Sequence, residues 1–386
     1  MRAWSGQWRP GEGFGEPLPA WDGPSTLVLV FASPAVIADD TPPDPGGPLA
    51  GLLEAYPASV VMGCSTAGEI LGGTIDDATV SVAVAQFAST RLRLLTGPIG
   101  GGTDSAAVGR DLAARLVAAE PDLAGVFVLS DGLRANGAQL AQGLSDGCAG
   151  TAVITGGLAG DGDRFDHTWV LVDGRPRTGM VSVLGLSGPH VRVGHGAGGG
   201  WSILGPERLV TRAEGNVVHE LDGQPALTLY RSYLGDRMGD TAASTLMFPL
   251  SVRAPEGRQG AVVRTVQALD ESAQSLVFTG DVPQGSIARL LRANTGELVD
   301  GAGEAVRRAD LVPGLPTLAL VVSCVGRRAV LGQRTEDELE MVMSRLPADV
   351  HLAGFYSYGE ISPIGEHTSG LLNQTLTVTT IQETAA

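Results

Sequence analysis

The stretch VVMGCSTAGEIL occupies Val60–Leu71, where an apolar strand runs into a glycine-rich turn and then a carboxylate. A similar stretch, HLAGFYSYGEIS, returns near the other end of the sequence at His351–Ser362. Both contain Gly-Glu-Ile, with the carboxylates at Glu69 and Glu360. This recurrence predicts that the chain contains the same structural unit more than once.

Comparison of the sequence with itself extends the recurrence to three strand–helix–strand units. Their first strands are LVLVFAS, VFVLSDG and LALVVSCVGRR, and each unit ends in Gly followed by an acid: Glu69, Asp161 and Glu360. Each is followed by a further strand, TVSVAVAQF, HTWVLVDG or QTLTVTTI. In the third unit, Thr335 three residues before Glu338 predicts a capping box. We therefore predict an α/β fold of two mixed α/β domains, built from a divergent, duplicated strand–helix–strand unit.

Composition limits the classes of function. At 386 residues the chain is long for one core, which favours two domains. The net charge of −16, from 42 acidic and 26 basic residues, argues against nucleic acid and against an anionic membrane surface. No apolar run reaches the roughly 18 residues of a membrane span, and the N-terminus lacks the apolar core of a signal peptide. Three widely spaced cysteines suit a reducing cytoplasm, where we place the protein.

The recurring turn has two interpretations. Ligands of open α/β sheets lie beyond the carboxyl ends of the strands, so the acid after each turn is placed to meet a ligand amine or a cation. The alternative is that the carboxylate only closes its own turn through local hydrogen bonds. We predict that the strand ends of the units face a common cavity.

Several side chains near these turns could carry chemistry. The Cys64–Ser65–Thr66 cluster could supply a nucleophile, but no histidine base is tied to a motif and no G-x-S-x-G elbow is present. We favour a cavity wall and keep a Cys- or Ser-dependent hydrolase as an alternative. His190 and His195 would point to opposite faces of a strand, and neither HExxH nor CxxC occurs, so no metal site is predicted.

The third unit adds cations and aromatic rings. Arg327 and Arg328 follow its first strand at the edge where the acids are expected, and a guanidinium matches a ligand carboxylate. An ion pair with one of the acids explains these arginines equally well. Tyr356 and Tyr358 alternate along GFYSYGEI and could form one wall of a pocket.

The motifs GCSTAGEI, GGLAGDG, VTRAEGNVVHELDGQPALTLY, SCVGRR, AGFYSYGEISP and NQTLTVT together resemble, in this order, the FIST family (F-box and intracellular signal transduction). The resemblance spans residues 25–382. It implies a FIST N-like domain at 25–223 and a FIST C-like domain at 224–386, after an irregular lead-in at 1–24. Where the family usually reads His-Asn-Gln-Thr, this chain has Leu372 in place of the histidine.

The resemblance implies a sensory module that binds a small polar metabolite such as an amino acid. Its output would pass to a separate histidine kinase, cyclic-dinucleotide enzyme or chemoreceptor. One branch of the family senses nitric oxide through haem, which stays an alternative; we expect no cofactor here because of Leu372. We predict that Glu360 and Arg327 hold opposite ends of the ligand, whereas Glu69 is structural. The expected ligand-binding residues are Cys64, Ser65, Thr66, Glu69, Asp161, Arg327, Arg328, Tyr356, Tyr358, Glu360 and Asn373.

Overall fold

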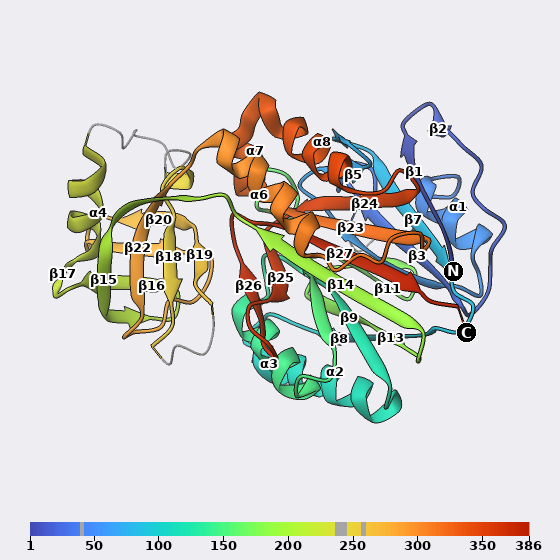
Figure 1. Ribbon diagram of the computed structural model, residues 1–386, viewed down its shortest axis with the longest axis horizontal. Helices are drawn as coiled ribbons and strands as arrows, with labels where there is room; N and C mark the ends of the chain where they lie inside the picture. The colour runs from blue at the N-terminus through green and yellow to red at the C-terminus, as the bar shows by residue number, and fades with distance from the viewer. Residues whose placement is uncertain (39–41, 236–244, 256–259, 386) are drawn as a thin grey trace.

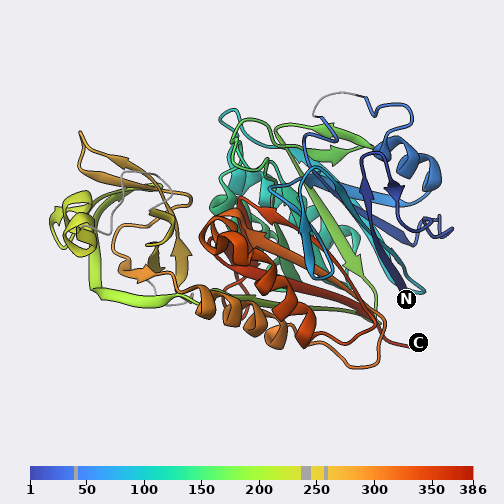
Figure 2. The same cartoon turned by 90° about the horizontal axis from the view of Figure 1, so that it is seen from above.

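The computed structural model describes residues 1–38, 42–235, 245–255 and 260–385. A main body of three mixed sheets carries a smaller lobe at one side, built around a fourth sheet (Figures 1 and 2). This arrangement is the mixed α/β class that the strand and helix patterns predict. Among the described residues, no helix combines the length and the apolar character that a membrane crossing requires.

The three predicted strand–helix–strand units are present, and each forms a parallel pair of strands. In each pair the second strand lies beside the first, in register along its whole length. The strand that completes each unit pairs antiparallel with the first strand. The units are β3 (Thr26–Ala32), α1 (Pro48–Ala55), β4 (Val60–Ser65) and β7 (Val80–Gln86); β9 (Leu123–Ser130), α3 (Gly137–Cys148), β10 (Val153–Leu158) and β13 (Met180–Ser187); and β23 (Thr317–Cys324), α7 (Val325–Leu331), α8 (Thr335–Arg345), β24 (Val350–Ser357) and β27 (Leu376–Glu383).

The units exchange the hairpins that follow their turns. Each hairpin leaves its own sheet and extends the sheet of another unit, so that the three units form a closed ring. The hairpins are β5 (Glu69–Leu71) with β6 (Thr74–Asp76) on β24, β25 (Gly359–Pro363) with β26 (Ser369–Leu372) on β10, and β11 (Val170–Val172) with β12 (Arg175–Arg177) on β4. HTWVLVDG, which follows the second unit in the sequence, is therefore the counterpart of the β5–β6 hairpin, and TGMVSVLGL (β13) is the counterpart of TVSVAVAQF.

The opposite edges of the sheets complete the same pattern. The strands β1 (Arg2–Arg9), β8 (Arg91–Pro98) and β14 (Val191–Gly198) pair with β7, β13 and β27. The residues at 1–24 are therefore not an irregular lead-in, because they contain β1 and the short β2 (Gly13–Phe14). The N-terminal ammonium of Met1 lies 3.2 Å from the carboxylate of Glu383, so the two ends of the chain meet.

A glycine in the second strand of each unit occupies the same place in all three units and serves as a register point for their comparison. A Cβ on Gly63, Gly156 or Gly354 would lie within 2.3 Å of a carbonyl oxygen of the first strand, so only glycine fits. Aligned on these glycines, Glu69 and Glu360 are equivalent, but Asp161 falls one residue early. The equivalent position in the second unit is occupied by Val170, which pairs with Cys64 as Glu69 pairs with Phe355 and Glu360 with Gly157. The predicted equivalence of Asp161 with the two glutamates is wrong.

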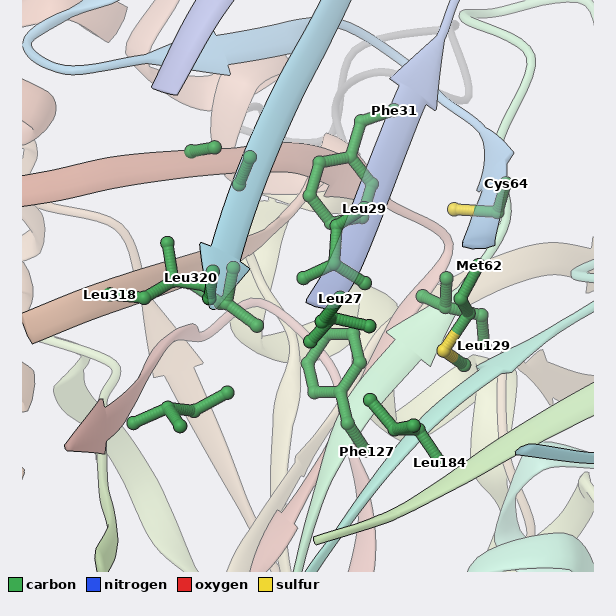
Figure 3. Packing of buried hydrophobic residues seen from close by; sticks show 14 of the residues in the cluster. Leu27, Leu29, Phe31, Met62, Cys64, Phe127, Leu129, Leu184, Leu318 and Leu320 are labelled. Atoms are coloured by element: carbon green, nitrogen blue, oxygen red, sulfur yellow. The ribbon is translucent and has the colours of Figure 1, made fainter. Parts of the chain in front are cut away.

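The largest apolar core fills the space where the sheets of the three units face one another. Leu27, Leu29 and Phe31 from β3 meet Phe127 and Leu129 from β9 and Leu318 and Leu320 from β23 (Figure 3). The rings of Phe31 and Phe355 stack at 4.9 Å. Each fully buried side chain of this size stabilises the fold by about 1.5–3 kcal/mol. Helices α2 (Ser105–Ala119), α3, α6 (Thr295–Arg308) and α8 cover outer faces of the sheets (Figure 1).

The lobe lies in the sequence between β14 and α6, ahead of the first strand of the third unit. Its antiparallel strands surround a separate apolar core to which helix α4 (Ala226–Leu234) also contributes. The predicted domain boundary at 223/224 lies inside this lobe, and strands from both sides of it share the third sheet. The lobe strands are β15 (Ser202–Glu214), β16 (Val217–Leu221), β17 (Gln224–Pro225), β18 (Leu250–Arg253), β19 (Val262–Arg264), β20 (Val266–Asp270), β21 (Ser275–Phe278) and β22 (Ile287–Arg292).

Candidate functional site

The glycine-rich turns of the three units meet at the carboxyl ends of β4, β10 and β24. Each turn donates one backbone hydrogen bond to a neighbour, always from the fourth residue after the register glycine to the second, so the bonds follow the ring. They run from Ala67 N to Tyr356 O (2.8 Å), from Gly160 N to Ser65 O (3.1 Å) and from Tyr358 N to Leu158 O (3.1 Å).

A cleft of about 700 Å³ opens beside the first turn, and we call it the Glu69 cleft. It lies at strand carboxyl ends, the position where ligands bind in α/β sheets. All three units contribute to its wall: the turn and hairpin of the first, the loop 162–164 of the second, and α7 with the start of α8 of the third. The polar side chains that line it are those of Ser33, Thr66, Glu69, Asp77, Asp163, Arg164, Arg328, Gln333, Thr335 and Glu336.

Glu69 lies at the base of this cleft and is almost fully buried. Its carboxylate accepts hydrogen bonds from the Thr66 hydroxyl and from the Thr79 amide and hydroxyl, at 3.0 and 2.9 Å. These three donors favour the charged form, but burial outweighs them and raises the pKa of Glu69 to about 7. The carboxyl therefore gains or loses its proton near neutral pH, at the edge of a cavity that can hold a ligand.

Arg328 forms the opposite side of the cleft. Its guanidinium binds both carboxylate oxygens of Asp77, at 2.8 and 2.7 Å, and donates a third bond to Ala67 O at 2.7 Å. The hydrogen bonds from Arg328 lower the pKa of Asp77. Gly68 has φ +134°, and a Cβ there would lie 2.7 Å from Nη1 of Arg328, so glycine is required for this approach.

Arg327 points away from the cleft, and its predicted role as a ligand clamp is wrong. The side chain is fully buried and donates two hydrogen bonds to Glu338, at 3.0 and 2.8 Å. Its remaining bonds go to backbone carbonyls, at 2.5 Å to Gly199, 2.8 Å to Leu298 and 3.4 Å to Gln374. Arg327 is thus in an ion pair, as the alternative predicted, but its partner is Glu338 and none of the three turn acids Glu69, Asp161 and Glu360.

Glu338 was missed as a site residue because its spacing from Thr335 predicts a capping box. In the structure its carboxylate instead accepts from the Tyr356 hydroxyl at 2.6 Å and from Ser323 at 3.0 Å, besides Arg327. Tyr356 thus belongs to a buried polar cluster of the third unit. Its ring also lies beneath Arg328, with the guanidinium carbon 5.8 Å from the ring centroid.

Glu360 repeats the hydrogen bonds of Glu69 in a fully buried position. It accepts from Ser357 at 2.8 Å and from the Thr375 hydroxyl and amide at 2.6 and 3.3 Å, and no part of it is exposed. Burial raises the pKa of Glu360 to about 8. Because Glu360 and Arg327 are both enclosed and paired within the protein, the predicted arrangement around one ligand does not fit the structure.

Cys64 and Ser65 lie behind the turn and line no cavity found in the described part of the chain. Cys64 packs in the largest apolar core (Figure 3), and burial raises the pKa of its thiol well above the usual value. The hydroxyl of Ser65 accepts a hydrogen bond from Trp169 N at 3.0 Å. The prediction that they contact a ligand is therefore wrong, because packing against the other sheets encloses both.

Asp161 and Tyr358 organise the loop that follows the second turn. Asp161 accepts bonds from the amides of Phe165, Asp166 and His167 at 2.9–3.0 Å and from the Tyr358 hydroxyl. Burial acts against ionisation, but these donors prevail and lower the pKa of Asp161. Asp161 does not line the Glu69 cleft, and the contacts it makes hold this loop in place.

Asn373 occupies, in the third unit, the position that Asp77 occupies in the first, two residues before the threonine that binds the glutamate. Its side chain is fully buried, and neither Oδ1 nor Nδ2 has a hydrogen-bond partner among the residues described.

Possible ligands for iron or another metal do not form a site among the described side chains. Within the described ranges, no group of three or more His, Cys, Asp or Glu side chains is arranged to hold a metal ion. Haem iron takes histidine, cysteine, methionine or tyrosine as its axial ligand. None of these lines the Glu69 cleft, and Leu372 is a buried residue of β26. The side chains of this cleft do not fit haem.

Two family models match the chain, the FIST N domain over residues 26–224 and the FIST C domain over residues 226–363. An uncharacterized protein of Mycobacterium bovis is 29% identical over 224 residues, which are 56% of this chain and 56% of that protein. An uncharacterized protein of Mycobacterium tuberculosis is 26% identical over 241 residues, 60% and 61% of the two chains. Each match thus spans less than two thirds of the relative.

Two solved structures are distantly similar. A chorismatase has a TM-score of 0.37 at 12% identity, with 98% of both chains covered. A cyanuric acid hydrolase from A. caulinodans has a TM-score of 0.27 at 11% identity, covering 93% of this chain and 90% of the other. The two family models together account for most of the sequence: the chain belongs to the FIST family, whose domains are sensory domains of signal transduction.

Proposed function

We propose that the protein is a small-molecule sensor and that the Glu69 cleft binds its ligand, a small polar metabolite of the amino-acid type. The observation that carries this proposal is the pairing, across one cavity, of a buried carboxyl with a pKa near neutrality and a half-buried guanidinium. An amino acid offers an ammonium for the first and a carboxylate for the second.

The two ends of such a ligand are recognised differently. An ammonium beside Glu69 favours the carboxylate, so binding drives the Glu69 proton into solvent or onto buffer. A ligand carboxylate competes with Asp77 for the N–H groups of Arg328, and Arg164 is a second cation on the cleft wall. Binding thus replaces the ion pair between Arg328 and Asp77 with one between Arg328 and the ligand, which limits the net gain in affinity.

The wall of the cleft supports a signalling role. Because the three units each contribute a segment, a bound ligand ties together the β5–β6 hairpin, the loop 162–164 and α7. The output would pass to a separate partner, such as a histidine kinase, a cyclic-dinucleotide enzyme or a chemoreceptor in the bacterial cytoplasm.

A thermal-shift screen of amino acids and related metabolites against the pure protein tests the proposal. A ligand at 100 times its Kd stabilises the folded state by about 2.7 kcal/mol. Arg328→Lys should abolish the shift, because a single ammonium cannot replace the planar fork that holds Asp77 and the ligand. Arg334→Lys, a change at an exposed arginine outside the cleft, is the matched control and should keep it. If Arg328→Lys binds a ligand found in the screen as well as the wild type does, the assignment of the Glu69 cleft as the ligand site is contradicted.

The two alternatives have separate tests. A Soret band in the isolated protein would support the haem sensor, although the cleft offers no axial ligand. Turnover of chromogenic esters or thioesters would support the hydrolase, against which the burial of Cys64 and Ser65 counts.

A further inference from the structure

A second cleft, of about 450 Å³, separates the main body from the lobe, and we call it the body–lobe cleft. Its body side includes residues 132–137, which lead from β9 into the start of α3, together with Phe165 and Tyr358. Its lobe side includes Asn216, Gln267 and Asp281. It shares none of its lining residues with the Glu69 cleft.

Phe165 is held in this cleft in a strained and exposed state. Its φ is +52°, a left-handed conformation that bulky residues rarely adopt, and 54% of the residue is exposed. Its ring stacks on Tyr358 with centroids 4.5 Å apart and an angle of 14°. The strain is maintained by Asp161, which binds the amides of residues 165–167. An exposed aromatic ring that is kept in a costly conformation indicates a role in binding.

The polar side chains around Phe165 suit a flat heterocycle with an anionic group. Asn216 donates a hydrogen bond from Nδ2 to the Phe278 carbonyl at 2.7 Å, and its Oδ1 can accept a hydrogen bond from a ligand. Within the part of the chain that the structure describes, the exposed carboxamide of Gln267 makes no hydrogen bond, so both its donor and its acceptor can pair with the edge of a base. The Arg134 side chain is 57% exposed, and its ion pair with Asp131 is long at 3.9 Å.

We propose that the body–lobe cleft binds a mononucleotide-like ligand. Its heteroaromatic ring stacks on the free face of Phe165, its edge pairs with Asn216 and Gln267, and its phosphate binds Arg134. The volume of the cleft lies in the range of small-molecule sites. The net charge of −16 disfavours a polynucleotide in the same place. Because the lobe supplies one wall, the ligand fixes the lobe against the body; this inference does not depend on the proposed function of the Glu69 cleft.

Calorimetry with AMP, GMP and flavin mononucleotide tests the proposal, with ribose 5-phosphate as the probe that lacks the ring. We expect at least one nucleotide to bind, and ribose 5-phosphate to bind at least about tenfold more weakly, since each stacked base contributes roughly 1–3 kcal/mol. Arg134→Gln should weaken the nucleotide but not its nucleoside. Glu69→Gln should leave the affinity unchanged, which separates this site from the Glu69 cleft.

Phe165→Asn is the decisive variant, because asparagine tolerates a positive φ. The melting temperature should stay equal or rise as strain is relieved, whereas nucleotide affinity should fall about tenfold or more. Failure of all three nucleotides to bind the wild type overturns the proposal. So does unchanged affinity in Phe165→Asn, or a melting temperature so much lower that the ring must be structural.

Discussion

The two Gly-Glu-Ile turns share a sequence and a hydrogen-bond pattern but differ in what lies against them. Each glutamate accepts from a hydroxyl three residues earlier and from a later threonine through both amide and hydroxyl. The first turn faces the start of α7, where Arg328 and Asp77 form one wall of a cleft. At the equivalent of Asp77 the second turn has Asn373, which carries no charge to attract an arginine.

The comparison shows that a local motif fixes a backbone and a set of hydrogen bonds, whereas the neighbouring element decides whether a ligand can enter. Arg134 stands four residues after the end of β9, as Arg328 stands four residues after the end of β23. The hairpin that faces Arg134 is β25–β26, where Asn373 stands in the place of Asp77. Arg134 instead lies 3.9 Å from the carboxylate of Asp131.

The largest expected effect separates the two adjacent arginines. Arg327→Ala should lower the free energy of unfolding by about 3–5 kcal/mol, because Glu338 would remain buried without its cation. Arg328→Ala should cost much less, since its ion pair with Asp77 is partly exposed. Urea denaturation of the two variants measures the difference, and equal losses would contradict the division between a structural and a ligand-facing arginine.

The pH dependence of stability should distinguish the two glutamates. A carboxyl whose pKa is raised by folding binds more protons in the folded state, so its contribution to stability falls as pH rises from the unfolded to the folded pKa. For Glu69 this window runs from about 4.5 to about 7, and for Glu360 from about 4.5 to about 8.

The difference in free energy of unfolding between the wild type and Glu69→Gln should therefore change by an amount on the order of 3 kcal/mol across the first window. Above pH 7 this difference should stay constant. The corresponding difference between the wild type and Glu360→Gln should continue to change up to pH 8. Denaturant unfolding at pH 5, 6, 7 and 8 provides both curves. Curves that are level throughout would show that neither carboxyl is protonated at neutral pH.

The glycines of the two turns give a smaller contrast. Gly68→Ala should lower stability by about 1–3 kcal/mol, because its φ is +134° and the new methyl would displace Arg328. At Gly359 the nearest obstacle is the end of the Leu371 side chain, 2.7 Å from the ideal Cβ, which can rotate away. Gly359→Ala should therefore cost less in a thermal melt. The reverse order would mean that Arg328 is not held against the first turn.

Much of the architecture could be predicted from the sequence because it is local. The alternation of short apolar strands and amphipathic helices identifies the three units, and the Gly-Glu-Ile turns mark their ends. The exchange of hairpins could not be predicted, because the short strand sequences EIL (β5) and ISP (in β25) do not indicate which sheet each hairpin will extend. The strand at Arg2–Arg9 was missed because its partly exposed, Trp- and Gly-containing sequence lacks a regular apolar alternation.

The sequence predicted a cavity at the strand ends, but it assigned the ligand to Glu360 and Arg327 of the third unit and a structural role to Glu69. Thr66, Glu69 and Arg328 do line one cleft at the strand ends, and the meeting of the three turns follows from the repeats. Arg327 and Arg328 are neighbours in the sequence, and only their rotation on α7 sends one into the interior and the other to the cleft. The choice between Glu69 and Glu360 depends on side chains more than 200 residues away in the sequence, from Arg328 to Asp77, which no local pattern reveals.

Calorimetric titration of Glu69→Gln and Glu360→Gln with a metabolite from the thermal-shift screen tests the central claim most directly. If the Glu69 cleft is the ligand site, Glu69→Gln should lose at least about thirtyfold in affinity, since one partner of a charged, buried hydrogen bond is removed. Wild-type binding should also release protons at pH 7, whereas Glu360→Gln should bind as the wild type does. Retained binding in Glu69→Gln together with lost binding in a folded Glu360→Gln would contradict this account and return the pocket to the third unit.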